Sequence, residues 1–148
     1  WNRIVLACSL FLTNTCAVFY QGYQNSGKKV SMGENSTREA RNGCCYGLHA
    51  EMDAIRKLPP IPLKAKKKKI NLVVIRVDRF GNLRNSGPCF KCIQYMQRLN
   101  TTTSYKIENV YYSNQDGNII MAKLSELVDQ ENKHISYAFR QKASRVQE

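Results

Sequence analysis

Apolar and polar residues alternate along the chain in patterns that predict strands interleaved with helices. Residues 71–77 form a run of apolar and β-branched side chains, which is typical of a central strand. Asn25-Ser26-Gly27 and Gln115-Asp116-Gly117 have the composition of tight turns, and each lies between two strand-like segments. These segments are residues 15–23, 28–35, 110–113 and 118–121. We therefore expect two hairpins and a central strand within one mixed sheet.

Two inner segments have the spacing of helices that bury one face. The first carries apolar residues at intervals of three and four, namely Leu48, Met52, Ile55 and Leu58. Pro59-Pro60 would end that helix after about three turns, because proline cannot continue the hydrogen-bond ladder. The second segment carries a stripe of the same kind, namely Cys89, Cys92, Ile93, Met96 and Leu99. We expect both stripes to face the core.

The ends of the chain predict two more helices around a single domain. Residues 4–12 are apolar but too few to cross a bilayer, which needs ~20 residues, so they predict a buried first helix. Residues 124–148 predict a polar closing helix. With 148 residues, of which 43% are hydrophobic, the chain is long enough for one sizeable core and short for two. We therefore expect one α/β domain over residues 1–148, with helices on the faces of the sheet.

Two short motifs, His49-Ala50-Glu51 and Pro88-Cys89-Phe90-Lys91-Cys92, contain the residues best suited to metal chemistry. Zn²⁺ prefers histidine nitrogen and cysteine sulfur, and a catalytic zinc site keeps one position open for water. Cys89 and Cys92 share one face of a helix, with Pro88 expected as its first residue. Their sulfurs then lie near a helix N-terminus, which favours the thiolate that binds metal. Three ligands and the carboxylate of Glu51 therefore outline a catalytic centre.

Glu51 lies within the apolar stripe of the first helix, three residues after Leu48 and four before Ile55. A carboxylate is costly to bury there unless it has a partner or a task. His49 and Glu51 are about 200° apart around an ideal helix, so both cannot face one metal from the middle of the helix. We therefore expect His49 in the first turn, with that end of the helix facing the site.

The same ligands would also fit a closed structural site, in which a fourth cysteine completes the tetrahedron. The candidates for that fourth ligand are Cys8, Cys16, Cys44 and Cys45. Glu51 would then be a surface charge. A set of disulfides is a further alternative, but six cysteines without a convincing secretory signal indicate a reducing compartment. The helix-start context of both motifs favours the catalytic interpretation.

Together the motifs H-x-E and P-C-x-x-C resemble the signature of the zinc-dependent cytidine and deoxycytidylate deaminase superfamily. The resemblance covers roughly residues 4–127 and implies a three-layer α-β-α fold around a mixed five-stranded sheet. It also implies that His49, Cys89 and Cys92 hold zinc, that a water takes the fourth position, and that Glu51 moves protons without binding the metal.

The resemblance also suggests substrate contacts. The short turn at residues 115–117 is similar to the division with an antiparallel final strand, where free cytidine deaminases lie. Gly33-Glu34-Asn35 resembles a glycine-to-asparagine segment of several branches, adenosine deaminases included. Asn35 is thus a candidate ligand for ribose or base, since its amide donates and accepts; a plain turn asparagine is the alternative. The full set of candidate contacts is Asn35, Ala50, Ser86, Gly87, Pro88 and Tyr112.

The net charge is +12, from 23 Lys and Arg against 11 Asp and Glu. Five lysines are concentrated in a predicted loop over residues 59–69, namely Lys64, Lys66, Lys67, Lys68 and Lys69. Such a field attracts phosphate, so we expect this basic surface to contact RNA, DNA or a nucleotide. A solvated loop and a nuclear import signal are the alternatives. The absence of interleaved aromatic residues favours phosphate attraction over base reading.

These residues predict an intracellular enzyme that converts cytosine to uracil in a nucleoside, nucleotide or polynucleotide. Two other functions fit the pattern: deamination of adenosine in RNA, and a basic nucleic-acid-binding or scaffold subunit that keeps the deaminase fold. The resemblance is compatible with a homo-oligomer, and no membrane association is expected. A cytoplasmic or nuclear location is expected, or an organellar one if a targeting peptide was removed before Trp1.

Overall fold

The computed structural model describes residues 15–22, 27–35 and 49–129 of the chain. Its strands are β1 Thr15–Gln21, β2 Lys28–Glu34, β3 Lys68–Val77, β4 Leu83–Arg84, β5 Tyr105–Ser113 and β6 Ile119–Lys123. Its helices are α2 Ala50–Arg56, α3 Phe90–Thr102 and α4 Leu124–Asp129. The predicted helix at residues 4–12, most of the turn at 25–27, Leu48 and the closing helix beyond Asp129 lie outside the described residues.

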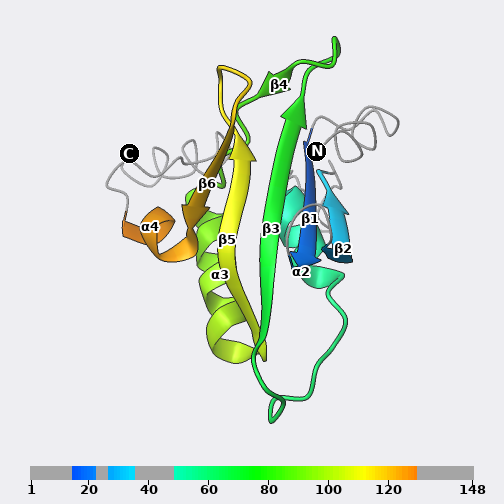
Figure 1. The fold of residues 1–148 in the computed structure, drawn as a ribbon, viewed down its shortest axis with the longest axis vertical. Coiled ribbons are helices and arrows are strands. Elements are labelled where there is room, and N and C mark those ends of the chain that lie inside the picture. Colours follow the sequence, from blue (N-terminus) through cyan, green and yellow to red (C-terminus); the bar gives the residue numbers. More distant parts are fainter. Residues whose placement is uncertain (1–14, 23–26, 36–48, 130–148) are drawn as a thin grey trace, which may run out of the picture.

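The strands form one mixed sheet in the order β2-β1-β3-β5-β6 (Figure 1). β3 and β5 are parallel, with α3 in the connection between them, and the other neighbouring pairs are antiparallel. The two predicted strand pairs, the central strand and the antiparallel final strand are therefore confirmed. The short β4, which pairs with the end of β3, has no apolar pattern that would predict it.

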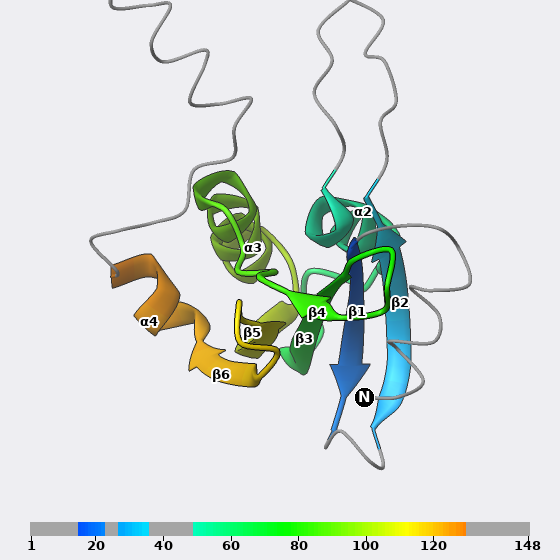
Figure 2. The ribbon, with the colours of Figure 1, turned by 90° about the horizontal axis from the view of Figure 1, so that it is seen from above.

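The described helices pack against one face of the sheet (Figure 2). The core between them contains alternate residues of the central strands, such as Phe19 of β1 and Leu72 and Val74 of β3. Of the predicted stripe, Cys92, Ile93, Met96 and Leu99 are buried on α3, and Cys89 is buried just before the helix begins. Among the described helices, none has the length and apolar character that crossing a membrane would require.

The opposite face of the sheet carries a second apolar cluster, made of Cys16, Val18, Val73, Ile75 and Val77. These residues alternate in sequence with those of the first cluster, as the two-residue period of a strand requires. A sheet that is apolar on both faces is typical of a layer enclosed between two others. The mixed α/β fold predicted from the sequence is confirmed.

β3 begins earlier than its apolar run predicts. Lys68 and Lys69 pair with the start of β5, and the Lys68 N–H donates to the Ser104 carbonyl at 2.7 Å. Backbone pairing extends the strand beyond the residues whose side chains are buried, because ladder hydrogen bonds do not depend on side-chain polarity. The expectation that both lysines lie in the loop of residues 59–69 is therefore wrong.

Two helix boundaries also differ from those predicted. Pro88 is not the first helical residue, because Cys89 is extended (φ −76°, ψ 167°) and α3 begins at Phe90. α2 ends at Arg56, before it reaches the Pro59-Pro60 pair that was expected to end it. The stripe of α2 is also wrong in part, since Met52 and Ile55 are only partly buried. The fully buried positions of α2 are Ala50, Glu51 and Ala54.

Candidate metal centre and active site

α2 is a helix of seven residues, too short to be stable alone, and β2 holds it in place. Gly33 of β2 marks the closest approach, because a Cβ atom there would overlap the backbone nitrogen of Ala54 and the carbonyl oxygen of Ala50. Beside this contact, Ser31 Oγ donates a hydrogen bond of 2.9 Å to the Ala54 carbonyl. Small residues at the contact therefore bring the start of α2 directly against the sheet.

His49 and Glu51 lie at the start of α2. His49 is the N-cap residue and its backbone is extended (φ −69°, ψ 147°), so it lies just before the first helical turn. This position allows His49 and Glu51 to face the same site, which two residues in the middle of a helix could not do. Glu51 is buried in the first turn, with 5% of its surface exposed. The Asp53 carboxylate accepts a 3.1 Å hydrogen bond from the Glu34 N–H, which ties this helix to the end of β2.

Cys89 and Cys92 lie at the start of α3, where Cys89 is the N-cap residue. Ser86 anchors the segment that leads to them. Its hydroxyl donates to the Val74 carbonyl at 2.7 Å and lies 2.8 Å from the Ser113 hydroxyl, while its N–H donates to the Ser113 carbonyl at 2.8 Å. Since Val74 belongs to β3 and Ser113 to β5, the cysteines are fixed relative to the two central strands.

The three predicted ligands form a compact triangle of side-chain atoms. His49 Nδ1 lies 3.3 Å from Cys92 Sγ and 3.4 Å from Cys89 Sγ, and the two sulfurs are 3.6 Å apart. Tetrahedral zinc, with Zn–S bonds of about 2.3 Å and Zn–N bonds of about 2.0–2.1 Å, requires about 3.8 Å between sulfurs and about 3.6 Å between sulfur and nitrogen. The triangle fits the ion. Within the described part of the chain it is the one group of three such residues placed to hold a metal.

Cys16 does not reach this triangle. It is buried in the second apolar cluster, on the face of the sheet opposite to the one that carries Cys92. The alternative of a closed structural site therefore loses this candidate for a fourth ligand. Cys8, Cys44 and Cys45 lie outside the described residues.

The residues of this site change one another's pKa values. The hydrogen bond with Cys92 lowers the pKa of Cys89 to about 4, so Cys89 is a thiolate at neutral pH. The same contact raises the pKa of Cys92, and the hydrogen bond with Cys89 raises the pKa of His49. Burial raises the pKa of Glu51 to about 7, which suits a group that both accepts and releases a proton. A thiolate suited to metal binding and a carboxyl group with a pKa near neutral thus lie at the same site.

A cavity of about 240 Å³ opens beside the triangle, with Glu51 in its wall. The predicted site residues that line it are Asn35, His49, Ala50, Glu51, Ser86, Gly87 and Cys89. Segments far apart in the sequence therefore meet at one hollow. Three further lining residues, Thr15, Arg76 and Asn85, are missing from the sequence prediction.

The missed residues follow from strand register. Thr15 and Arg76 are paired across β1 and β3, and Arg76 shares the helix-side face of β3 with Val74. Alternation along residues 71–77 would have placed Arg76 on that face, but only the pairing of β1 with β3 shows that it meets Thr15. Asn85 follows β4, a strand without an apolar pattern.

Two predicted contacts do not line this cavity. Pro88 is buried in the approach to α3, and Tyr112 is half-buried with its ring beside Gly87, whose Cβ position would lie 3.7 Å from it. The Gly87 N–H donates to Asn85 Oδ1 at 3.0 Å. Since the Ser86 N–H is also engaged, backbone carbonyls are the groups here that could accept a hydrogen bond from an amine. Base stacking by Tyr112 stays a prediction.

The lysine run reaches the start of β3, whereas Arg76 in the wall of this cavity lies near the opposite end of the same strand. Figure 1 shows β3 as a long strand that separates its two ends. Lys68 begins the strand and Arg76 lies near its end, about 26 Å away at about 3.3 Å per residue. The run is therefore remote from Glu51 and cannot contribute to the same small-molecule pocket.

Two of the five lysines have partners within the protein. Lys67 Nζ donates to the carbonyls of Asn100 and Thr103, at 2.7 and 2.6 Å, which satisfies the C-terminal end of α3. Lys69 forms an ion pair of 3.1 Å with Glu108. Nucleic-acid contact through Lys64, Lys66, Lys67, Lys68 and Lys69 stays a prediction.

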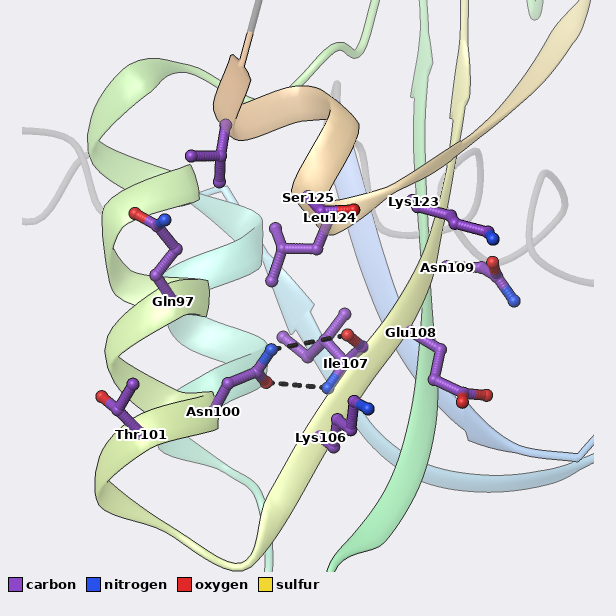
Figure 3. A pocket seen from close by; sticks show the side chains of 11 residues that line it. Gln97, Asn100, Thr101, Lys106, Ile107, Glu108, Asn109, Lys123, Leu124 and Ser125 are labelled. Carbon is purple, nitrogen blue, oxygen red and sulfur yellow. Dashed lines mark hydrogen bonds between the residues drawn. The ribbon is translucent and has the colours of Figure 1, made fainter.

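A larger cavity, of about 670 Å³, lies between α3, α4 and β5 (Figure 3). The Asn100 side chain in its wall accepts from the Ile107 N–H at 2.8 Å and donates to the Ile107 carbonyl at 3.5 Å, so this amide serves to join α3 to β5. The residues that line this cavity include no histidine or cysteine. Chemistry, rather than size, therefore identifies the smaller cavity as the candidate active site.

Comparison with known proteins gives a match in structure but not in sequence. No protein-family profile and no curated protein matches the sequence. A similar solved structure is that of the dCMP deaminase from the cyanophage S-TIM5 in its apo form, with a TM-score of 0.50 and 17% sequence identity. The alignment covers 90% of this chain and 93% of that chain. The chain therefore has a cytidine deaminase-like fold.

Proposed function

We propose that the protein is a zinc-dependent hydrolytic deaminase that converts cytosine to uracil. One observation carries this proposal: the triangle of His49, Cys89 and Cys92 lies beside the buried Glu51 at the wall of one cavity. Three protein ligands leave the fourth tetrahedral position open, which is the arrangement of catalytic zinc. The fold shared with the cyanophage dCMP deaminase supports the same class of reaction.

Glu51 is the residue that moves protons in this reaction. Zinc, when bound by the three ligands, would make a water nucleophilic at neutral pH. Glu51 accepts a proton from the attacking water and delivers it to the adjacent ring nitrogen, and it then assists the departure of ammonia. A C–O bond forms and a C–N bond breaks, so one water is consumed and one ammonia is released. A pKa of about 7 allows Glu51 to act in both directions near neutral pH.

The size of the cavity favours a pyrimidine over a purine. Its volume of about 240 Å³ lies below the ~300 Å³ at which most ligand pockets begin, so a single ring fits better than a fused one. Asn35 lies at the rim, where its amide can meet the sugar or the base. Backbone carbonyls of the segment at Ser86 can accept hydrogen bonds from the exocyclic amine. Adenosine in RNA is the less favoured substrate on these grounds.

Glu51→Gln is the test of the mechanism. The substitution keeps the shape of the side chain but removes proton transfer, so we expect turnover of cytosine substrates to fall by about 10²–10⁴-fold. The assay follows loss of the exocyclic amine from cytidine, deoxycytidine, dCMP and a cytosine-containing oligonucleotide, with adenosine as a comparison. Zinc analysis should still give one metal per chain, because Glu51 is not a ligand.

A matched control is Glu108→Gln, which removes a carboxylate that pairs with Lys69 and does not line the site. This variant should keep wild-type turnover. Activity that survives Glu51→Gln would overturn the mechanism. A zinc-loaded wild-type protein without turnover on any substrate would instead favour a scaffold that binds nucleic acid, for which the net charge of +12 is the supporting observation.

A further inference from the structure

Arg76 belongs to the walls of two adjoining cavities. The smaller one contains Glu51, and the larger, of about 780 Å³, lies between the β3–β4 and β5–β6 turns. Arg76 and Asn85 line both. The two cavities therefore adjoin at these two residues, and a ligand longer than the smaller cavity would pass Arg76 on its way to the larger one.

The arginines of this second cavity are unequally neutralised. Arg76 and Arg84 are directly opposite each other on antiparallel strands, so their side chains share one face and their like charges repel. Arg84 is compensated by Asp78, whose carboxylate accepts from its Nε and Nη2 at 3.0 and 2.8 Å. Within the described residues, the Arg76 side chain forms no ion pair or side-chain hydrogen bond. Of these two opposed arginines, Arg84 is neutralised by Asp78 and Arg76 keeps a positive charge that is available to an anion.

The turn that carries these arginines is internally braced. Asp78 Oδ1 accepts from the N–H groups of Phe80 and Asn82, both at 2.9 Å. Gly81 has a φ of +82°, which favours glycine and closes the turn. Arg79 lies over the Phe80 ring at 5.0 Å. The backbone from which these guanidinium groups project is therefore fixed by hydrogen bonds within the turn.

The carboxylates of this second cavity do not cancel the positive charge of its arginines. Asp78 and Asp116 are its two carboxylates, against the three guanidinium groups of Arg76, Arg79 and Arg84. Asp78 is already committed to Arg84 and to the turn. The remaining balance is positive, and Arg76 contributes to it at the junction with the smaller cavity.

We propose that this arginine cavity, defined by Arg76, Arg79 and Arg84, binds a phosphate of the substrate whose base occupies the smaller cavity. The inference rests on the proposed function and narrows it: the substrate is a nucleotide or a stretch of polynucleotide, not a free nucleoside. Arg76 is the specificity-determining residue, because a planar guanidinium donates paired hydrogen bonds to phosphate oxygens. The remote lysine run is not required for this recognition.

The experiment compares Arg76→Gln with wild type on deoxycytidine, dCMP and a single-cytosine oligonucleotide. For the wild type we expect kcat/KM on a phosphorylated substrate to exceed that on deoxycytidine by tenfold or more. In Arg76→Gln that ratio should fall at least tenfold. Arg98→Gln is the control, since Arg98 lies on α3 over the Tyr95 ring and lines neither cavity. It should leave the ratio unchanged.

Calorimetric titration separates this inference from the proposed function. Zinc-loaded protein should bind dCMP at least tenfold more tightly than deoxycytidine, and Arg76→Gln should remove the difference, whether or not turnover occurs. Equal affinity for both ligands in the wild type would overturn the phosphate site while leaving deamination intact. The two sources of phosphate differ in salt dependence, because a polynucleotide releases several counterions and gives a steeper slope of log affinity against log salt than dCMP does.

Discussion

The two helices that begin at the candidate metal ligands are held in the protein in different ways. α3 has 13 residues and buries a full apolar stripe, whereas α2 has seven residues and is attached through small residues that let its backbone touch β2. The positions of Cys89 and Cys92 therefore depend on packing of the core. The positions of His49 and Glu51 depend on the fit of one backbone against another at Gly33. Removing core volume and adding one methyl group should thus affect different halves of the centre.

The largest expected effect on stability comes from removing core volume under α3. Met96 is fully buried, so Met96→Ala should lower the free energy of unfolding by about 2–5 kcal/mol. Met52→Ala is the counterpart on α2 and should cost less than half as much, since Met52 is only partly buried. Urea unfolding measures both. Equal losses would show that α2 depends on side-chain packing as much as α3 does.

A smaller loss of stability, but a direct effect on the metal centre, is expected from Gly33→Ala. The added methyl group overlaps backbone atoms that cannot rotate away, so α2 must move, at a cost of about 1–3 kcal/mol. Because His49 moves with α2, zinc content per chain should fall as well. Metal analysis and urea unfolding give the two readouts.

Gly87→Ala is the matched control for that substitution. A Cβ atom at Gly87 would lie 3.3 Å from Asn85 Oδ1, the end of a side chain that can turn away. This variant should keep wild-type zinc content and lose little stability. If Gly33→Ala behaved in the same way, the backbone contact would not be what positions α2.

The smallest effect is expected from the hydrogen bond beside that contact. Ser31→Ala removes the donor to the Ala54 carbonyl and should lower the free energy of unfolding by about 0.5–1.5 kcal/mol. Thr101→Ala removes a hydroxyl that donates to the Arg98 carbonyl on the exposed side of α3, and it should have almost no effect. A loss in Ser31→Ala no greater than in Thr101→Ala would show that this hydrogen bond does not help to hold α2 against β2.

The same contrast explains what the sequence could predict. The buried stripe of α3 could be predicted from the sequence, because apolar residues such as Met96 and Leu99 recur at helical intervals. Glu51 was identifiable because a carboxylate within an apolar stripe requires a reason. The buried face of α2 could not be predicted, because it is determined by contact with Gly33, which is distant in sequence and becomes a neighbour only in the folded protein.

The arginine cavity shows a second limit of sequence reasoning. The lysine run is conspicuous in the sequence because its charges are consecutive, yet it lies far from the metal centre. Arg76 and Arg84 are separated by a turn and become neighbours only through the pairing of β3 with β4. Charge density along the chain is therefore a poor guide to the charge density around a site.

The order of the strands also determines when the centre can appear during synthesis. The β1–β2 hairpin can form as soon as Glu34 is available, but the other edge of β1 pairs with β3, with Cys16 opposite Ile75. Until β3 has been made, that edge of β1 is a template for wrong pairing. His49 must also wait for Cys92, which follows β3. Capture of a metal by these residues would therefore be a late event on a growing chain, and it would mark chains whose central strand is already in place.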